Sequence, residues 1–187
     1  MQSIEAQKEA QDQDARDYLA QLEERERTKA NHVPGVQKVL VVLSTTGLVF
    51  DTESLRQMIL YAYPEAAVFF RTTSGKALGV EAPKQVDLLI DLTGPGQRSP
   101  LLYAYRLKGM ARFSVGRNAG LFRARIYDRV YDEKPILSRL PRNTLDRERV
   151  VQREVLALAG VAMIAMAHAT PDRGKEIALD LPPLSRT

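Results

Sequence analysis

The sequence predicts a single Rossmann-like α/β domain of three layers, with a mostly parallel sheet and an additional amino-terminal helix. Two observations predict it. Residues 39–43 form an unbroken apolar, β-branched run, which is typical of a strand buried on both faces. A polar turn at 44–47 leads from this run into an amphipathic helix, and such a strand, turn and helix open a doubly wound fold. Ligands bind these folds at the carboxyl ends of the strands, so we expect residues 44–47 to border any site.

Length and composition limit the kinds of chemistry available. The chain has 187 residues, which suits one domain with a sizeable core. It contains no cysteine, which excludes disulfides, thiolate metal sites and cysteine nucleophiles and fits a reducing compartment. Its two histidines, His32 and His168, lie far apart in sequence and do not favour a zinc site, although carboxylates could hold magnesium or calcium. The sequence therefore implies neither a metal nor an organic cofactor.

The sequence shows neither a signal peptide nor a membrane-spanning segment. The amino terminus shows no basic segment followed by an apolar one, so we predict no signal peptide. No run reaches the ~20 apolar residues of a membrane span. We therefore expect a cytoplasmic protein.

Residues 2–30 are polar and charged, with Ala15, Leu19 and Leu22 at helical spacing. This pattern predicts a solvated helix. A docking helix or short coiled coil is the alternative, but the heptads do not persist for the three or four repeats that would support it. We expect His32 to be a solvated residue of the linker that follows, rather than a ligand.

The first helix of the domain is predicted to begin at Asp51 or Thr52, either of which can cap it, and to end before Pro64. Its apolar residues recur at helical spacing: Leu55, Met58, Ile59 and Ala62.

Two further apolar runs predict strands at 66–70 and 86–92, the first of them followed by a polar connection at 71–79. The strand at 86–92 opens into a glycine-containing loop at 93–98, ahead of a helix predicted from about 99 to 108. The backbone N–H groups of this loop could approach an anion at the positive end of that helix. The alternative is a Gly-Pro turn that serves only to reverse the chain.

The net charge of +4 is concentrated in residues 98–129. The basic residues of this window, against the single acid Asp128, are Arg98, Arg106, Lys108, Arg112, Arg117, Arg123, Arg125 and Arg129. Such a window suits phosphates, carboxylated sugars, an anionic membrane surface or nucleic acid, or is simply solvated. Nucleic acid is not favoured, because Phe113 and Phe122 fit no RNA-binding pattern and no helix-turn-helix is legible.

The carboxyl-terminal part predicts a short strand within 127–131 and a long helix capped by Asn143, with Asp146 in its first turn. From 150 to 169 this helix is almost wholly apolar, and we expect it to pack against the sheet, with an interface as the alternative and His168 as a capping residue. The expected organisation is a helical extension and linker (1–35), one domain (36–170) and an extended tail (171–187).

Several short motifs follow one another in a distinctive order. Residues 44–52 read Ser-Thr-Thr-Gly-Leu-Val-Phe-Asp-Thr, and the helix after them ends in Tyr-Pro at 63–64. The next strand ends in Asp-Leu-Thr-Gly at 91–94, with Arg-Ser at 98–99.

Two more motifs complete the series, Arg-Phe-Ser-Val-Gly at 112–116 and Tyr-Asp-Arg-Val-Tyr at 127–131. Together, residues 38–70 and 86–132 resemble the amino-terminal, acceptor-binding half of the heptosyltransferases. These are GT-B glycosyltransferases that build the inner core of bacterial lipopolysaccharide.

The chain departs from the family pattern at two points. The acid that follows the loop glycine is the family's expected general base, and the matching residue here is Leu48, which cannot accept a proton. Asp51 stands at the family's histidine position, and we expect it to cap the helix, with a substitute-base role as the weak alternative. The family binds its nucleotide sugar mainly in a second α/β domain, and this chain ends where the linker to that domain would be expected.

The resemblance implies a non-catalytic, heptosyltransferase-like module that assembles with another protein or a second copy, or that binds an anionic glycan. The alternative is the acceptor-binding half of a split glycosyltransferase for lipopolysaccharide or another surface glycan, peripheral at the inner membrane. A scaffold that binds no glycan is a third possibility. The expected ligand-binding residues are Thr45, Thr46, Gly47, Gly94, Gln97, Arg98, Arg117, Asn118 and Arg123.

Overall fold

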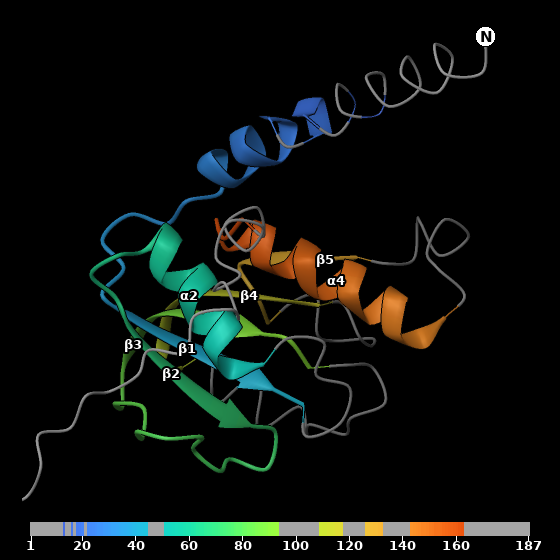
Figure 1. The fold of residues 1–187 in the computed structure, drawn as a ribbon. Coiled ribbons are helices and arrows are strands. Elements are labelled where there is room, and N and C mark those ends of the chain that lie inside the picture. The colour runs from blue at the N-terminus through green and yellow to red at the C-terminus, as the bar shows by residue number, and fades with distance from the viewer. Residues whose placement is uncertain are drawn as a thin grey trace, which may run out of the picture.

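The computed structural model describes residues 13, 16, 18–20, 22–44, 51–93, 109–117, 126–132 and 143–162. Its strands are β1 (Lys38–Leu43), β2 (Ala67–Thr72), β3 (Val86–Asp91), β4 (Ala111–Arg117) and β5 (Arg129–Tyr131). They form one sheet in the order β2-β1-β3-β4-β5, and every pair is parallel (Figure 1). Since parallel neighbours need crossover connections, this order confirms the predicted Rossmann-like α/β fold.

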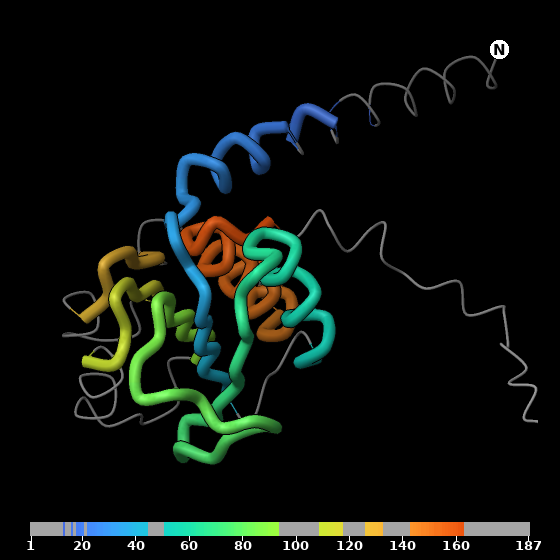
Figure 2. The backbone as a smooth tube through the Cα atoms, turned by 90° about the vertical axis from the view of Figure 1, so that its left-hand side faces the viewer, coloured from blue at the N-terminus to red at the C-terminus, as the bar shows by residue number. Residues whose placement is uncertain are grey.

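The two faces of the sheet have different partners. Val39 and Leu43 of β1 point into the main core, together with helices α2 (Thr52–Ala62) and α4 (Thr144–Leu158). Both helices lie on the same side of the sheet (Figure 2). Leu40 points to the opposite face, where Ala82 and Met110 pack. Because β1 is buried on both faces, its apolar run does not alternate with polar residues.

Helix α2 follows the predicted pattern. Asp51, rather than Thr52, is its N-cap, and the helix ends at Ala62, ahead of Pro64. Leu55, Met58 and Ile59 are fully buried against the sheet.

Strand β2 is longer than the predicted strand at 66–70, because Arg71 and Thr72 belong to it. Their backbones pair in parallel with Val42 and Leu43 of β1. Hydropathy alone does not reveal this extension, since strand pairing uses backbone groups and is compatible with polar side chains. An isolated antiparallel bridge between Arg71 and Ala77 follows, so the connection predicted for 71–79 begins two residues later.

Helix α4 starts at the predicted cap, Asn143, but ends at Leu158 rather than continuing through the apolar segment. Gly160 has a φ of 74°, a left-handed conformation that ends the helix at little cost. The N–H of Gly160 donates to Ala157 O at 3.1 Å and that of Val161 to Leu156 O at 2.9 Å. These two bonds form a Schellman motif, so hydrophobicity continues past the helix while the helix itself stops. His168, the expected capping residue, lies outside the described residues.

Residues 22–30 are helical and lead into the linker before β1 (Figure 1). Arg27 pairs with Glu154 of α4 at 2.8 Å, and Asn31 Nδ2 donates to the carbonyl oxygen of Ala157 at 3.1 Å. Farther out, Leu19 is 59% exposed. The ring of His32 stacks on Tyr63 with 4.6 Å between centroids, so this exposed linker residue also has a partner. In the described part of the chain, no helix is both long and apolar enough to cross a membrane.

Candidate functional site

The strand order places a candidate ligand site between β1 and β3. After β1 the chain passes to β2 on one side, whereas β3 lies on the other side of β1. In an open parallel sheet, connections that diverge in this way leave a ligand crevice at the carboxyl ends of the two strands. Here those ends lead into Ser44 and Thr93, which are both buried. The two loops predicted to border the site, at 44–47 and 93–98, therefore start from neighbouring strands.

Asp91 is the buried carboxylate of this edge and the last residue of β3. Its Oδ1 accepts a hydrogen bond from the backbone N–H of Thr93 at 2.9 Å, and its Oδ2 accepts one from the hydroxyl of Tyr127. Donors on both oxygens offset the cost of burying a carboxylate. Asp91 thus fixes the start of the loop after β3 and ties it to the segment that precedes β5.

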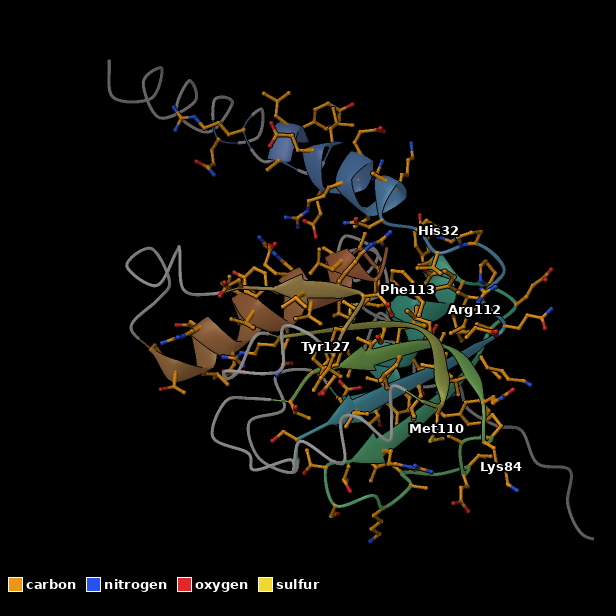
Figure 3. The ribbon with its side chains drawn as sticks, turned by 180° about the vertical axis from the view of Figure 1, so that it is seen from behind. His32, Lys84, Met110, Arg112, Phe113 and Tyr127 are labelled. Carbon is orange, nitrogen blue, oxygen red and sulfur yellow. The ribbon has the colours of Figure 1, made fainter. Side chains whose placement is uncertain are left out.

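Gly116, which has no side chain, makes room for the ring of Tyr127. A Cβ on Gly116 of β4 would lie 2.5 Å from Cε2 and Cζ of the Tyr127 ring, far inside van der Waals contact. Glycine at this position therefore lets the ring lie directly on the strand. Figure 3 shows Tyr127 toward the carboxyl end of β3, away from Arg112 and Met110 at the other end of the sheet.

Arg117, one of the predicted ligand contacts, is the last residue of β4 and only 3% exposed. Its Nη1 donates to both carboxylate oxygens of Glu148 on α4, at 2.9 and 2.8 Å. Glu148 is itself mostly buried, with a side chain 16% exposed. The pair ties the amino-terminal part of α4 to the carboxyl end of β4, so Arg117 has an intramolecular partner at the same end of the sheet as the candidate site.

Asp51, the weak base candidate, is engaged as a helix cap. Its Oδ1 accepts from the N–H of Ser54 at 2.7 Å, and its Oδ2 accepts from the Ser54 hydroxyl at 2.8 Å. These hydrogen bonds, the backbone one first, lower the pKa of Asp51 below its usual range. Because a general base works best with a pKa near the working pH, this shift weakens Asp51 as a proton acceptor.

The other predicted contact residues lie outside the described residues. They are Thr45, Thr46, Gly47, Gly94, Gln97, Arg98, Asn118 and Arg123. The strands that precede these residues end at Leu43, Asp91 and Arg117.

The described arginines of the basic window are divided between the two ends of the sheet. Arg117 lies at the carboxyl end of β4, whereas Arg112 lies near its amino end and donates to the carbonyl oxygen of Pro34 at 2.7 Å. Arg129 donates to the carbonyl oxygens of Asn31 and Leu158 and covers the ring of Phe113 at 4.9 Å. These three side chains join segments of the domain and do not gather on one surface.

Metal binding has no support among the described residues, where no group of three or more histidine, aspartate or glutamate side chains could hold an ion.

Sequence reasoning missed Asp91 and Tyr127 as residues of the site edge. Both stand in the motifs at 91–94 and 127–131 that carry the family resemblance, but neither is among the expected ligand-binding residues. Signals exist in hindsight, since an acid at the end of an apolar strand and a glycine at 116 are both unusual choices for a buried sheet. Their partnership spans 36 residues of sequence, and no local pattern shows it.

Fold and strand order define the chain as a Rossmann-like α/β domain whose strand order reverses between β1 and β3. No protein-family model, no curated protein and no solved structure matches it.

Proposed function

We propose that this chain is a non-catalytic, heptosyltransferase-like domain that binds an anionic glycan at the carboxyl ends of β1 and β3. The observation that carries the proposal is the reversal of strand order between these strands, with buried Ser44, Asp91 and Thr93 at that edge. Folds of this kind bind their ligands at such a point, and polar groups there orient a polar ligand.

The non-catalytic part of the proposal draws support from the carboxylates near this edge. Asp51 caps helix α2 by accepting hydrogen bonds from Ser54, and both oxygens of Asp91 accept hydrogen bonds from the protein. Leu48 stands where the resembled family has its base.

Titration calorimetry of the full chain tests the proposal. The probes are inorganic phosphate, glucose 6-phosphate and glucuronate, with glucose as the neutral control, each at low and raised salt. We expect saturable binding of at least one anion that weakens with salt, and no binding of glucose. If none of the anions binds, the chain is not an anionic-glycan module. If Asp51→Asn abolishes a glycosyl-transfer activity measured with a nucleotide sugar, the split-transferase alternative replaces this proposal.

An assembly role is a second candidate, favoured by the amino-terminal helix. Tyr18 and Leu19 are 62% and 59% exposed, and Leu22 lies on the same side of the helix. Large apolar side chains that remain exposed on a helix leading out of the domain suit contact with a second copy of the chain. Light scattering of the wild type and of Leu19→Glu/Leu22→Glu tests this: loss of a dimer in the variant supports it, and a wild-type monomer at all concentrations excludes it.

A further inference from the structure

Among the described residues, Arg71 is a mostly buried cation with one ion-pair partner. Its side chain is only 15% exposed, and its Nε is buried without a hydrogen-bond partner among the described residues. Its ion-pair partner in the structure is Glu81, at 3.9 Å, and the Glu81 side chain is 82% exposed. A long pair with a solvated carboxylate contributes little to stability.

This arrangement is unusual in energetic terms. A guanidinium group carries five N–H donors and keeps its charge at every physiological pH. Burying such a group without a close anion costs free energy, and buried polar groups of native proteins nearly always have partners. A mostly buried cation whose Nε has no partner among the described residues therefore suits an anion from outside the chain.

The backbone places Arg71 at the ligand-binding end of the sheet. Arg71 pairs with Val42 of β1, and Val42 pairs with Asp91 of β3. Partners in a parallel register share a face, so the three residues form one row on the face opposite α2 and α4. With strands about 4.8 Å apart, the Cα of Arg71 lies about 10 Å from that of Asp91. On the outer side, the bridge partner of Arg71 is Ala77, whose side chain is small.

From these observations we propose that Arg71 is the anchor for the anionic group of the ligand, a phosphate or a carboxylate. The proposal rests on the proposed anionic-glycan function and names its principal contact. It assigns this task to a residue outside the arginine-rich window, whose buried member Arg117 is already paired with Glu148. A planar guanidinium suits either anion, since it can donate two parallel hydrogen bonds to both.

The test compares Arg71→Met with the wild type and with Arg56→Met. Arg56 is the matched control, because it contacts the same strand from the helix-covered face: its guanidinium donates to Val68 O and lies 5.2 Å from the centre of the Phe70 ring. By calorimetry with phosphate, glucose 6-phosphate and glucuronate, we expect Arg71→Met to lose about 10- to 100-fold in affinity and Arg56→Met to change little. Preference for glucose 6-phosphate or for glucuronate distinguishes a phosphate from a carboxylate ligand.

Stability in a buffer free of multivalent anions provides a second measurement that needs no ligand. Removing a mostly buried charge whose ion pair with Glu81 is long and solvated should leave the unfolding midpoint of Arg71→Met equal to or above that of the wild type. A clearly lower midpoint would assign Arg71 a structural role and overturn the inference. If the wild type binds an anion and Arg71→Met binds it equally well, the inference fails and the proposed function stands. If the wild type binds no anion, both fail.

Discussion

Tyr127 donates its hydroxyl hydrogen bond to Asp91, and the bond joins the segment before β5 to the carboxyl end of β3. The strand between them, β4, allows this contact because Gly116 presents no side chain under the ring. The edge at which the proposed ligand binds is therefore held by a contact across three neighbouring strands, and it should respond to changes at each of the three residues.

Removing the tyrosine hydroxyl should destabilise the domain. In Tyr127→Phe, the buried Oδ2 of Asp91 loses its donor, and the cost of leaving such a group unsatisfied is about 1–3 kcal/mol. Urea denaturation measures this loss. Tyr61→Phe is the matched control, because Tyr61 is 72% exposed and its midpoint should not move. Equal midpoints for wild type and Tyr127→Phe would contradict a stabilising bond.

A methyl group at position 116 should displace the ring. Gly116→Ala puts a Cβ 2.5 Å from Tyr127, and overpacking of this kind typically costs about 1–3 kcal/mol. The loss should be smaller in the background of Tyr127→Ala, where the ring is absent. A double-mutant cycle of unfolding free energies gives the coupling, and a coupling of zero would show that the two residues do not meet.

Breaking the buried pair of Arg117 and Glu148 should be among the most damaging single changes. Arg117→Met leaves the Glu148 carboxylate mostly buried without this partner, for which losses of about 3–5 kcal/mol are typical. The double variant Arg117→Met/Glu148→Met should lose less than the sum of the single variants, since no charge remains unpaired. Thermal or urea unfolding measures all three, and strict additivity would argue against the pairing.

Tyr63 should make stability fall at high pH. Its hydroxyl donates to Ala159 O at 2.6 Å and accepts from the N–H of Val33 at 3.2 Å. Burial raises the pKa of Tyr63 above 10.0, although the Val33 N–H and the charge of Arg129 oppose this. The unfolded state therefore loses its proton first. The neutral phenol therefore contributes its full share of the folding stability below about pH 10, and this contribution is lost as the pH rises through the raised pKa of the folded state.

The variant that isolates this effect is Tyr63→Phe. Near neutral pH it should be less stable than the wild type by about 1–3 kcal/mol, because Ala159 O and Val33 N–H lose their partner. Urea unfolding at about pH 8 and about pH 11 should show this difference shrinking as the pH rises. A difference that stays constant over that range would contradict the proposed ionisation.

The cap at Asp51 predicts a pattern in the acid range. Asp51→Ala should cost about 1 kcal/mol, whereas Asp51→Asn should be nearly neutral, since asparagine caps helices as well as aspartate does. The pKa of Asp51 is lower in the folded state than in the unfolded state. The stability due to its charge is therefore present at pH values above the unfolded-state pKa, and it is lost as the pH falls through the folded-state pKa. Wild type and Asp51→Asn should therefore be nearly equal near neutral pH, and the wild type should fall below Asp51→Asn in acid. Unfolding free energies of both, followed downward from neutral pH, provide the measurement.

Local patterns in the sequence were sufficient for most of the fold. The apolar run of β1, the cap at Asp51, the stop at Pro64 and the cap at Asn143 each depend on residues within one or two turns of one another. Such signals act through backbone geometry and side-chain spacing, which are readable along the chain. The predicted bounds were wrong at Arg71 and Leu158. Strand β2 continues through the polar residue Arg71, and helix α4 ends at Leu158 although the sequence after it is apolar. In both places backbone hydrogen bonding, rather than hydropathy, sets the end of the element.

The periodicity of short segments was enough to predict an α/β domain with a mostly parallel sheet and the strand ends at which we propose that a ligand binds. The partners of the polar residues near that edge depend on the three-dimensional packing. Tyr127 and Asp91 are 36 residues apart in sequence, and Arg117 and Glu148 are 31 apart. Their contacts depend on the strand order, which cannot be inferred from local spacing. The same order puts Arg71 in a row with Asp91, and among the described residues the Nε of Arg71 has no hydrogen-bond partner.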